Sequence, residues 1–188
     1  MHSYHGVHGR LPPAVVYGKD GRPLYSWRVL LLPYLEEQEL YQEFHLDEPW
    51  NSPHNMQLLV RMPASYAPPP RKASKLPAYH TYCRVFIGPG TLFEHPEGNT
   101  LASITDGTSR TLFVVEAGEP VPWTMPEGLA YDPNGPLPDL TGPFHDGFRV
   151  TFADGSRGFI RKDVSEAMLR ALITRNGGES VRYDEVDP

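Results

Sequence analysis

The sequence predicts an α+β fold, with helices in the first part of the chain and antiparallel strands in the second. Leucines recur at roughly helical spacing over residues 27–44, opposite a face of glutamates. Farther along, Asp154 and Gly155 separate two runs of β-forming residues, 148–152 and 157–160. An Asp-Gly pair in this setting is the strongest short-range signal for a hairpin. Sequential hairpins with separate helices favour α+β over a parallel sheet.

Length and charge bound the class of protein. The 188 residues suit one ordinary domain, so a single domain over 1–188 is predicted. The 21 prolines and 17 glycines show no period, which predicts many turns and long loops. A net charge of -6, from 17 basic and 23 acidic residues, excludes the basic footprint of a nucleic-acid-binding protein. Cys83 is the only cysteine, so no intrachain disulfide forms.

The first elements are short. Residues 1–9 are rich in His and Gly and are predicted to be the end of a helix, stopped by Gly6 or Gly9. An apolar patch at 14–17, followed by a glycine-bounded turn at 18–21, predicts a short strand and a turn.

Two helices are predicted next. The longer one covers residues 27–44, with Ser26 as its N-cap and Pro33 close enough to its start to be tolerated. The Ser-Pro pair at 52–53 is predicted to begin a shorter helix, with Ser as the cap and Pro in the first position, and Pro63 is predicted to end it.

The middle of the chain alternates extended runs with proline-rich loops. Residues 64–78 are predicted to form an extended connector. Strands are predicted at 79–87 and at 110–116, the second of them central because both of its faces are apolar. Residues 118–143 contain seven prolines and are predicted to be a long irregular excursion, a kind of loop that is usually functional or disordered.

After the hairpin, one more helix is predicted. Asp163 is its expected N-cap, and the left-handed residues at 176–178 are its expected end. The tail at 179–188 is predicted to be frayed.

Several blocks of the sequence occur together in an order that is more specific than any one block alone. They are YHGVHGRLPP at 4–13, SWRVLLLPYLE at 26–36, ITDGTSRT at 104–111, FADGS at 152–156 and LRALITRNGGE at 169–179. The sequence therefore resembles the domain-of-unknown-function 1559 (DUF1559) family, whose members are abundant in planctomycete-type bacteria and many of which carry a type IV prepilin-like N-terminal helix. The last block resembles one subgroup.

This resemblance implies a pseudopilin-like architecture, with helices packed on an antiparallel sheet and long Pro/Gly-rich loops. It also implies export, association with the cell envelope and contact with protein partners there, as in proteins related to type II secretion and type IV pili. It implies no enzymatic reaction. The family's members continue upstream into a long helix with an apolar half, so residues 1–9 are expected to be the remnant of that helix and its anchor is expected to be missing upstream.

The chain departs from the family near its C-terminal signature. The family has a His, nine residues and then Asp-Gly, whereas His145 is followed by eight residues before Asp154. The family's His-Pro-Gly-Gly is here His145, Asp146 and Gly147. One residue is missing ahead of the strand.

The printed sequence contains no export signal, because residues 1–9 are not an apolar run behind basic residues. The longest apolar stretch, 29–32, is far too short to span a bilayer. Family resemblance thus favours an extracytoplasmic location, and the sequence alone leaves a cytoplasmic one open.

Candidate metal ligands are weak in pattern. His2, His5 and His8 share a helix face loosely, but glycines weaken that helix and no fourth ligand lies near them. His80 and Cys83 fall on opposite faces of a strand, so Cys83 is predicted to be a small core residue. Calcium would suit the oxygen-bearing residues of the excursion, although their spacing matches no EF-hand: Asp132, Asn134, Asp139 and Asp146. No metal site is predicted.

Four residues are candidates for binding: Trp123, His145, Asp154 and Glu116. The favoured hypothesis is a non-enzymatic structural or interaction domain, without catalytic residues. One alternative is a peptide- or glycan-binding module that uses the 118–143 loop and Trp123, although this tryptophan is better explained as an anchor of the loop. A second alternative is a hydrolase built around His145, Asp154 and Glu116, but none of the common catalytic or phosphate-binding motifs is present.

Overall fold

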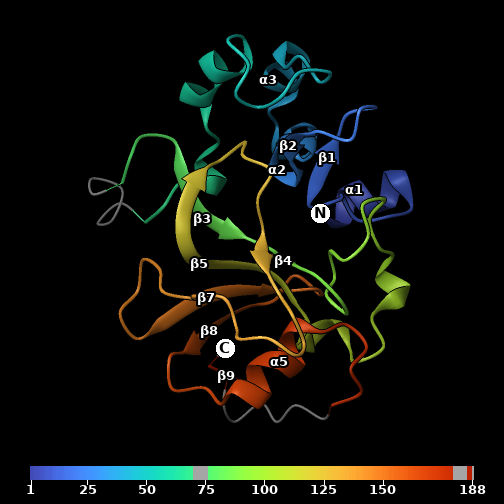
Figure 1. Ribbon diagram of the computed structural model, residues 1–188, viewed down its shortest axis with the longest axis vertical. Coiled ribbons are helices and arrows are strands. Elements are labelled where there is room, and N and C mark those ends of the chain that lie inside the picture. Colours follow the sequence, from blue (N-terminus) through green and yellow to red (C-terminus); the bar gives the residue numbers. More distant parts are fainter. Residues whose placement is uncertain (70–75, 180–185, 188) are drawn as a thin grey trace. The chain divides into compact units, whose positions relative to one another are not determined.

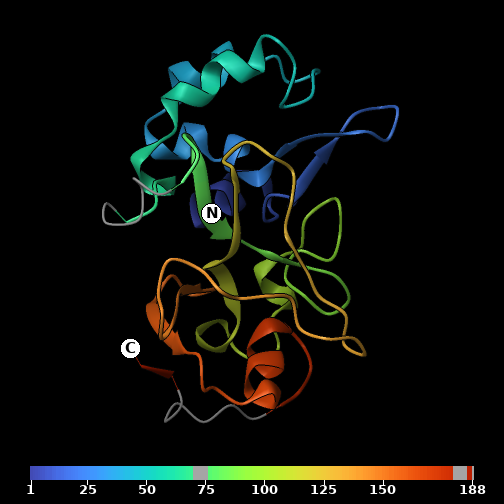
Figure 2. The ribbon, with the colours of Figure 1, turned by 60° about the vertical axis from the view of Figure 1, so that its left-hand side comes forward.

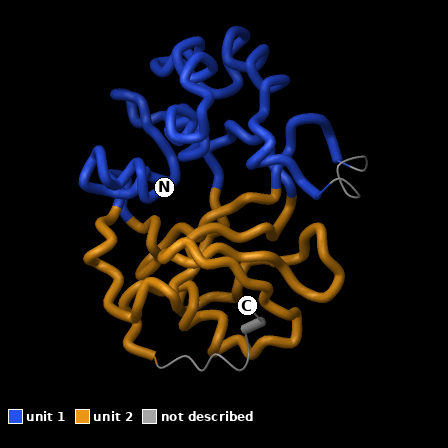
Figure 3. Tube along the Cα trace, turned by 180° about the vertical axis from the view of Figure 1, so that it is seen from behind, with its two compact units in different colours: residues 1–81, 95–98, 120–127 blue, residues 82–94, 99–119, 128–188 orange. Residues whose placement is uncertain are grey.

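The computed structural model describes residues 1–69, 76–179 and 186–187. It combines helices with mostly antiparallel sheets, so the predicted α+β class is confirmed (Figure 1). The pseudopilin-like arrangement stays a prediction. The chain divides into two compact units (Figure 3): unit 1 comprises 1–81, 95–98 and 120–127, and unit 2 comprises 82–94, 99–119 and 128–188. Organisation as a single domain also stays a prediction.

Unit 1 begins with helix α1 (His2–His8). The helix ends at Gly9, one of the two glycines predicted to stop it. Gly9 has φ 71°, a left-handed conformation that glycine adopts without steric cost, and its N–H bonds to the carbonyl of His5. Strands β1 (Val15–Tyr17) and β2 (Pro23–Ser26) then form an antiparallel pair around the predicted turn.

The single helix predicted over 27–44 is wrong. The segment forms helix α2 (Trp27–Leu30), the 3₁₀ helix η1 (Leu32–Leu35) and helix α3 (Gln38–Glu43). Pro33 has no N–H for a helical bond, and Glu36 has φ 65°, which no continuous right-handed helix contains. The leucine stripe points inward in part: Leu31, Leu40 and Phe44 are buried, whereas Leu35 is only half-buried. Ser26 is the N-cap, as predicted: its hydroxyl accepts from the N–H of Arg28.

The second helix also differs from the prediction. It is a 3₁₀ helix, η2 (Asn55–Arg61), and Ser52 accepts a hydrogen bond from the N–H of Asn55 ahead of it. Asn55 is fully buried, and its amide bonds to main-chain groups of His45, Glu48 and Pro49, which fixes the preceding loop.

The predicted connector at 64–78 is extended only in part. It opens with the 3₁₀ helix η3 (Ala64–Tyr66), whose Tyr66 side chain is buried. Residues 70–75 of that connector lie outside the described residues.

The main sheet has five strands in the order β3-β5-β7-β8-β9 (Figure 1). They are β3 (His80–Arg84), β5 (Leu112–Pro122), β7 (Gly147–Phe152), β8 (Arg157–Arg161) and β9 (Val186–Asp187). Strands β7 and β8 form the predicted hairpin, and Gly155 has φ 90° in its turn. β9 lies within the tail that was predicted to be frayed, of which 180–185 and 188 are outside the described residues.

The excursion predicted at 118–143 is irregular only in part. Strand β5 continues to Pro122, and strand β6 (Leu129–Ala130) pairs in parallel with β4 (Phe86–Ile87). The N–H of Leu129 donates to the carbonyl of Val85 and the N–H of Tyr131 donates to the carbonyl of Ile87, each at a distance of 2.8 Å. Prolines do not prevent these strands, because proline is tolerated wherever a strand needs no N–H donor.

Helix α5 (Glu166–Ile173) closes unit 2. Its N-cap is Ser165, whose hydroxyl accepts from Met168, and Asp163 instead binds Arg161. The predicted left-handed end is also wrong: the helix stops at Thr174, which is extended. The glycines of the predicted cap do not close the helix, because the N–H groups of Gly177 and Gly178 donate to the Asp106 carboxylate instead of to helix carbonyls.

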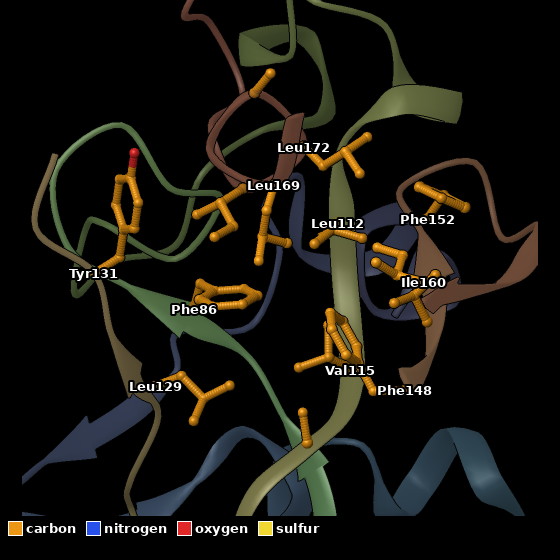
Figure 4. Close-up of a cluster of buried hydrophobic side chains, with 14 residues drawn as sticks. Phe86, Leu112, Val115, Leu129, Tyr131, Phe148, Phe152, Ile160, Leu169 and Leu172 are labelled. Carbon is orange, nitrogen blue, oxygen red and sulfur yellow. The ribbon is translucent and has the colours of Figure 1, made fainter. Parts of the chain in front are cut away.

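The core of unit 2 lies between α5 and the sheet. Figures 1 and 2 both show α5 beside β7 and β8. Side chains of α5 point toward those of β5, β7 and β8 (Figure 4); among the labelled residues these are Leu169, Leu172, Leu112, Val115, Phe148, Phe152 and Ile160. This packing fixes β7 and α5, which supply lining residues to a pocket in unit 2.

Candidate functional site

Unit 2 contains a pocket of about 380 Å³. This volume lies within the usual range for small-ligand sites, roughly 300–1,000 Å³. We call it the unit 2 pocket, and the residues that line it are Leu137, Pro138, Asp139, Leu140, Thr141, Phe144, His145, Gly147, Phe148, Arg161, Lys162, Val164, Glu166 and Leu169.

Regular structure supplies one side of the pocket. Phe148 comes from β7 and Leu169 from α5, and both are buried. The N–H of Lys162 donates to the carbonyl of Asp146 over 2.8 Å, and Gly147 pairs with Arg161 in the β7–β8 register. The chain around His145 therefore runs directly beside the end of β8.

The rest of the lining comes mainly from the irregular segment 137–144. Phe144 is held there by an edge-to-face contact with Phe159, at 5.8 Å between ring centroids, and by the Arg149 guanidinium 4.7 Å from its ring centroid. Arg170 on α5 donates to the carbonyls of Asp132 and Gly135, so the turn ahead of this segment is tied to the helix.

Most charged groups of the lining are engaged locally. Arg161 donates two hydrogen bonds to Asp163, of 3.1 and 3.2 Å. Glu166 accepts two from Arg170, of 2.9 and 2.7 Å. Asp139 accepts from the N–H of Thr141 at 2.8 Å, and this bond, with one from the Thr141 hydroxyl, lowers the pKa of Asp139 below its usual range. Asp139 is therefore anionic at neutral pH.

The sequence-predicted residues do not gather in the pocket. Only His145 of the four lines it. Asp154 lies in the β7–β8 turn, where its carboxylate accepts from the N–H and the hydroxyl of Ser156. Glu116 lies half-buried on β5. Trp123 belongs to unit 1.

Trp123 anchors the segment 120–127 within unit 1, as the structural interpretation of this residue predicted. Its side chain is fully buried, stacks on Tyr66 at 6.0 Å and meets Phe44 edge-to-face at 5.9 Å. Its indole N–H donates to the carbonyl of Leu59 over 3.2 Å. A fully buried ring presents no surface for recognising a ligand.

The residues considered as metal ligands take part in local structure. His8 bonds to the Tyr34 hydroxyl at 3.0 Å and stacks on Tyr4, and Asp132 accepts from the N–H of Asn134. Cys83 is half-buried rather than a full core residue. Within residues 1–69, 76–179 and 186–187, no three His, Cys, Asp or Glu side chains are grouped to hold a metal ion.

Sequence reasoning missed the pocket. The sequence feature that could have indicated it is the presence of large apolar residues in or next to a proline-rich loop: Leu137, Leu140 and Phe144. Loops usually run over the surface and are polar, so apolar side chains spaced by three and four along one indicate a segment that covers or lines something.

Glu116 gives a testable pH dependence. Burial raises its pKa above the usual value of 4.5, although the charges of Arg149 and Arg157 oppose the shift. A carboxyl group whose pKa is higher in the folded state than in the unfolded state makes the protein less stable as the pH rises from the unfolded-state pKa through the folded-state pKa. We expect Glu116→Gln to increase the free energy of unfolding at pH 7 by less than about 1 kcal/mol, because solvent screens a half-exposed group. Urea unfolding at pH 4 and pH 7 measures this; a gain that is larger at pH 4 than at pH 7 would contradict it.

The comparisons with known proteins concern mainly unit 1. Residues 1–86 match the model of a family described as protein of unknown function (DUF1559). No curated protein and no solved structure matches the chain. In the described part of the chain, no helix is both long and apolar enough to cross a membrane. The unit 2 pocket lies outside the matched residues. The family resemblance seen in the sequence blocks is confirmed over residues 1–86, where the chain matches the DUF1559 family model.

Proposed function

We propose that this protein is a non-enzymatic interaction domain of the cell envelope and that it binds an apolar peptide segment in the unit 2 pocket. The observation that supports this most is the lining of the pocket, which is mainly apolar and carries a few polar groups at defined positions. Sites with this composition usually bind ligands by burial and orient them by a small number of polar contacts.

The composition of the lining also favours binding over catalysis. The described lining residues include neither serine nor cysteine, and the Thr141 hydroxyl donates to the Asp139 carboxylate. His145 and Lys162 therefore have no free nucleophile in the described lining to activate, and Arg161 and Glu166 are held by neighbouring groups. A nucleophile needs a base within hydrogen-bond distance, and a general acid or base needs freedom to meet the substrate.

A peptide fits the irregular wall of the pocket. Among the described residues, the main-chain N–H groups of Leu137, Asp139 and Leu140 have no protein acceptor. An extended peptide laid along this wall would accept hydrogen bonds from them while its side chains enter the pocket, as in other cases of peptide recognition through main-chain pairing.

The extracytoplasmic location rests on the family resemblance and on the DUF1559 match over residues 1–86. Fractionation of cells that express the natural gene, with detection by an antibody to this chain, tests it directly. Recovery of the protein with the cytosol alone would remove this part of the proposal.

Filling the pocket tests the binding function. Thr141 is exposed and lines the pocket, so Thr141→Trp places an indole in it while retaining the main-chain N–H. We expect the affinity for the probe acetyl-Leu-Phe-amide to fall about tenfold, because the indole displaces one buried side chain of the peptide. Amide NMR shifts during a titration of the protein give both the affinity and the location.

Thr105→Trp is the matched control, since Thr105 is also an exposed threonine of unit 2 and does not line the pocket. It should leave the affinity unchanged. Equal affinity for wild type and Thr141→Trp, or shifts confined to residues away from the pocket, would rule out this site.

A further inference from the structure

We propose that the unit 2 pocket recognises a free C-terminal carboxylate, which Lys162 and His145 bind while the apolar side chains next to it enter the pocket. This inference rests on the proposed function, because it names the part of the peptide that the same site selects. It assigns a ligand class to two residues that lie outside the family match.

Charges around the pocket point to these two residues. Arg161 is matched by Asp163, and Glu166 is matched by Arg170, each through two hydrogen bonds. Lys162 and His145 are exposed, and neither forms a side-chain hydrogen bond or ion pair within the described parts of the chain. Lys162 acts on Asp163 only through its charge, which lowers the pKa of that carboxyl less than Arg161 does. A cation without a local partner at the edge of an apolar pocket favours an anionic ligand.

The backbone places Lys162 and His145 on neighbouring segments. The N–H of Lys162 bonds to the carbonyl of Asp146, one residue beyond His145, and the adjoining Gly147 pairs with Arg161. Both residues line the pocket. A carboxylate has two oxygens, so it can accept from an ammonium and from an imidazole N–H at once.

Asp139 sets the direction of the bound peptide. It lies on the irregular wall, and its hydrogen bonds from Thr141 keep it anionic. A second carboxylate beside it would be repelled, whereas one at the β7–β8 edge meets the lysine. The terminus therefore lies at Lys162 and His145, and the preceding residues run toward Leu140.

A peptide suits this site better than a fatty acid. The N–H groups of Leu137, Asp139 and Leu140 have no acceptor among the described residues. A peptide supplies carbonyl acceptors along its length, whereas a fatty acid has acceptors only in its carboxylate. A pocket of about 380 Å³ is ample for two apolar side chains, and the main-chain donors would add nothing to the binding of an alkyl chain.

The test compares four protein forms with three probes by calorimetric or NMR titration. The probes are acetyl-Leu-Phe with a free carboxylate, the same peptide as its amide, and octanoate. The protein forms are the wild type, Lys162→Gln, Lys19→Gln and Thr141→Trp. Lys19 is the matched control, since it is an exposed lysine in the β1–β2 turn of unit 1.

We expect the wild type to bind the peptide acid about three- to tenfold more tightly than the amide, as a charge-assisted hydrogen bond at a partly exposed site allows. In Lys162→Gln this ratio should fall to within about twofold, and Lys19→Gln should retain the wild-type ratio. Octanoate should bind at least about threefold more weakly than the peptide acid, because it makes no main-chain hydrogen bonds.

Each other result decides a separate point. Equal binding of acid and amide, with both abolished by Thr141→Trp, would overturn the carboxylate inference and leave the peptide-binding function standing. An unchanged ratio in Lys162→Gln would also overturn it. Octanoate binding as tightly as the peptide acid would show that the ligand is an alkyl carboxylate and not a peptide. If no probe binds in the pocket, the proposed function itself fails.

Discussion

Replacing Trp123 by alanine is expected to lower the free energy of unfolding by about 3–5 kcal/mol, the usual cost of removing a fully buried tryptophan. The indole contacts Phe44 and Tyr66 and donates to Leu59, so its loss leaves a large cavity and an unpaired carbonyl. The Trp123 carbonyl also accepts from Ser26 and Arg28, which couples the cavity to the start of helix α2.

The measurement is urea unfolding followed by circular dichroism, with hydrogen exchange to assign the loss to unit 1. Trp50→Ala is the control, because Trp50 is only half-buried and should cost less than about 2 kcal/mol. Trp123→Phe retains the ring contacts but not the hydrogen bond and should fall between the two. A loss below about 1 kcal/mol for Trp123→Ala would contradict its role as the anchor of unit 1.

Local signals predicted much of the fold. The β7–β8 hairpin was predictable because Asp154 and Gly155 define a turn by themselves, whatever lies elsewhere in the chain. Gly9 as the end of helix α1 and Ser26 as the N-cap of α2 were predictable for the same reason. Each depends on a bond between residues only a few positions apart.

Features set by distant partners were not predictable. No residue near Glu36 in the sequence predicts its φ of 65°, which helps to divide the 27–44 segment into three helices. Strand β6 forms only because Phe86 and Ile87 present a parallel edge, so a short Leu-Ala pair in a proline-rich loop gave no sign of it. Periodicity reports which side chains face inward, and it does not report where the main chain turns.

The same limit applies to the candidate site. His145 was identified from the family signature and does line the pocket. Lys162 carried no signal, because an exposed lysine near the end of a strand is ordinary. Phe148 and Leu169 appeared as a strand residue and a helix residue, and only the fold brings them to one pocket with Leu140. A site assembled from separate segments is therefore recognised from the structure first.

The second large effect concerns Gly88, which joins β4 to the loop after it. Its φ is 138°, and a Cβ there would lie deep inside van der Waals contact with the carbonyl oxygen of Tyr131. That carbonyl cannot move away freely, because the N–H of Tyr131 bonds to Ile87 and that of Leu129 bonds to Val85. Gly88→Ala is thus expected to break the β4–β6 pair.

We expect Gly88→Ala to lower the free energy of unfolding of unit 2 by about 3 kcal/mol or more, the sum of a strained backbone and a main-chain clash. Gly107→Ala separates the two terms: Gly107 has φ 102°, but a Cβ there meets no atom within 4 Å. Strain alone should cost it about 1–2 kcal/mol. Urea unfolding of both variants, with hydrogen exchange at Leu129 and Tyr131, gives the comparison. Equal losses of unfolding free energy in the two variants would mean that β4 and β6 separate at little cost. The β4–β6 pair would then not hold the segment that leads from β6 to the unit 2 pocket in place.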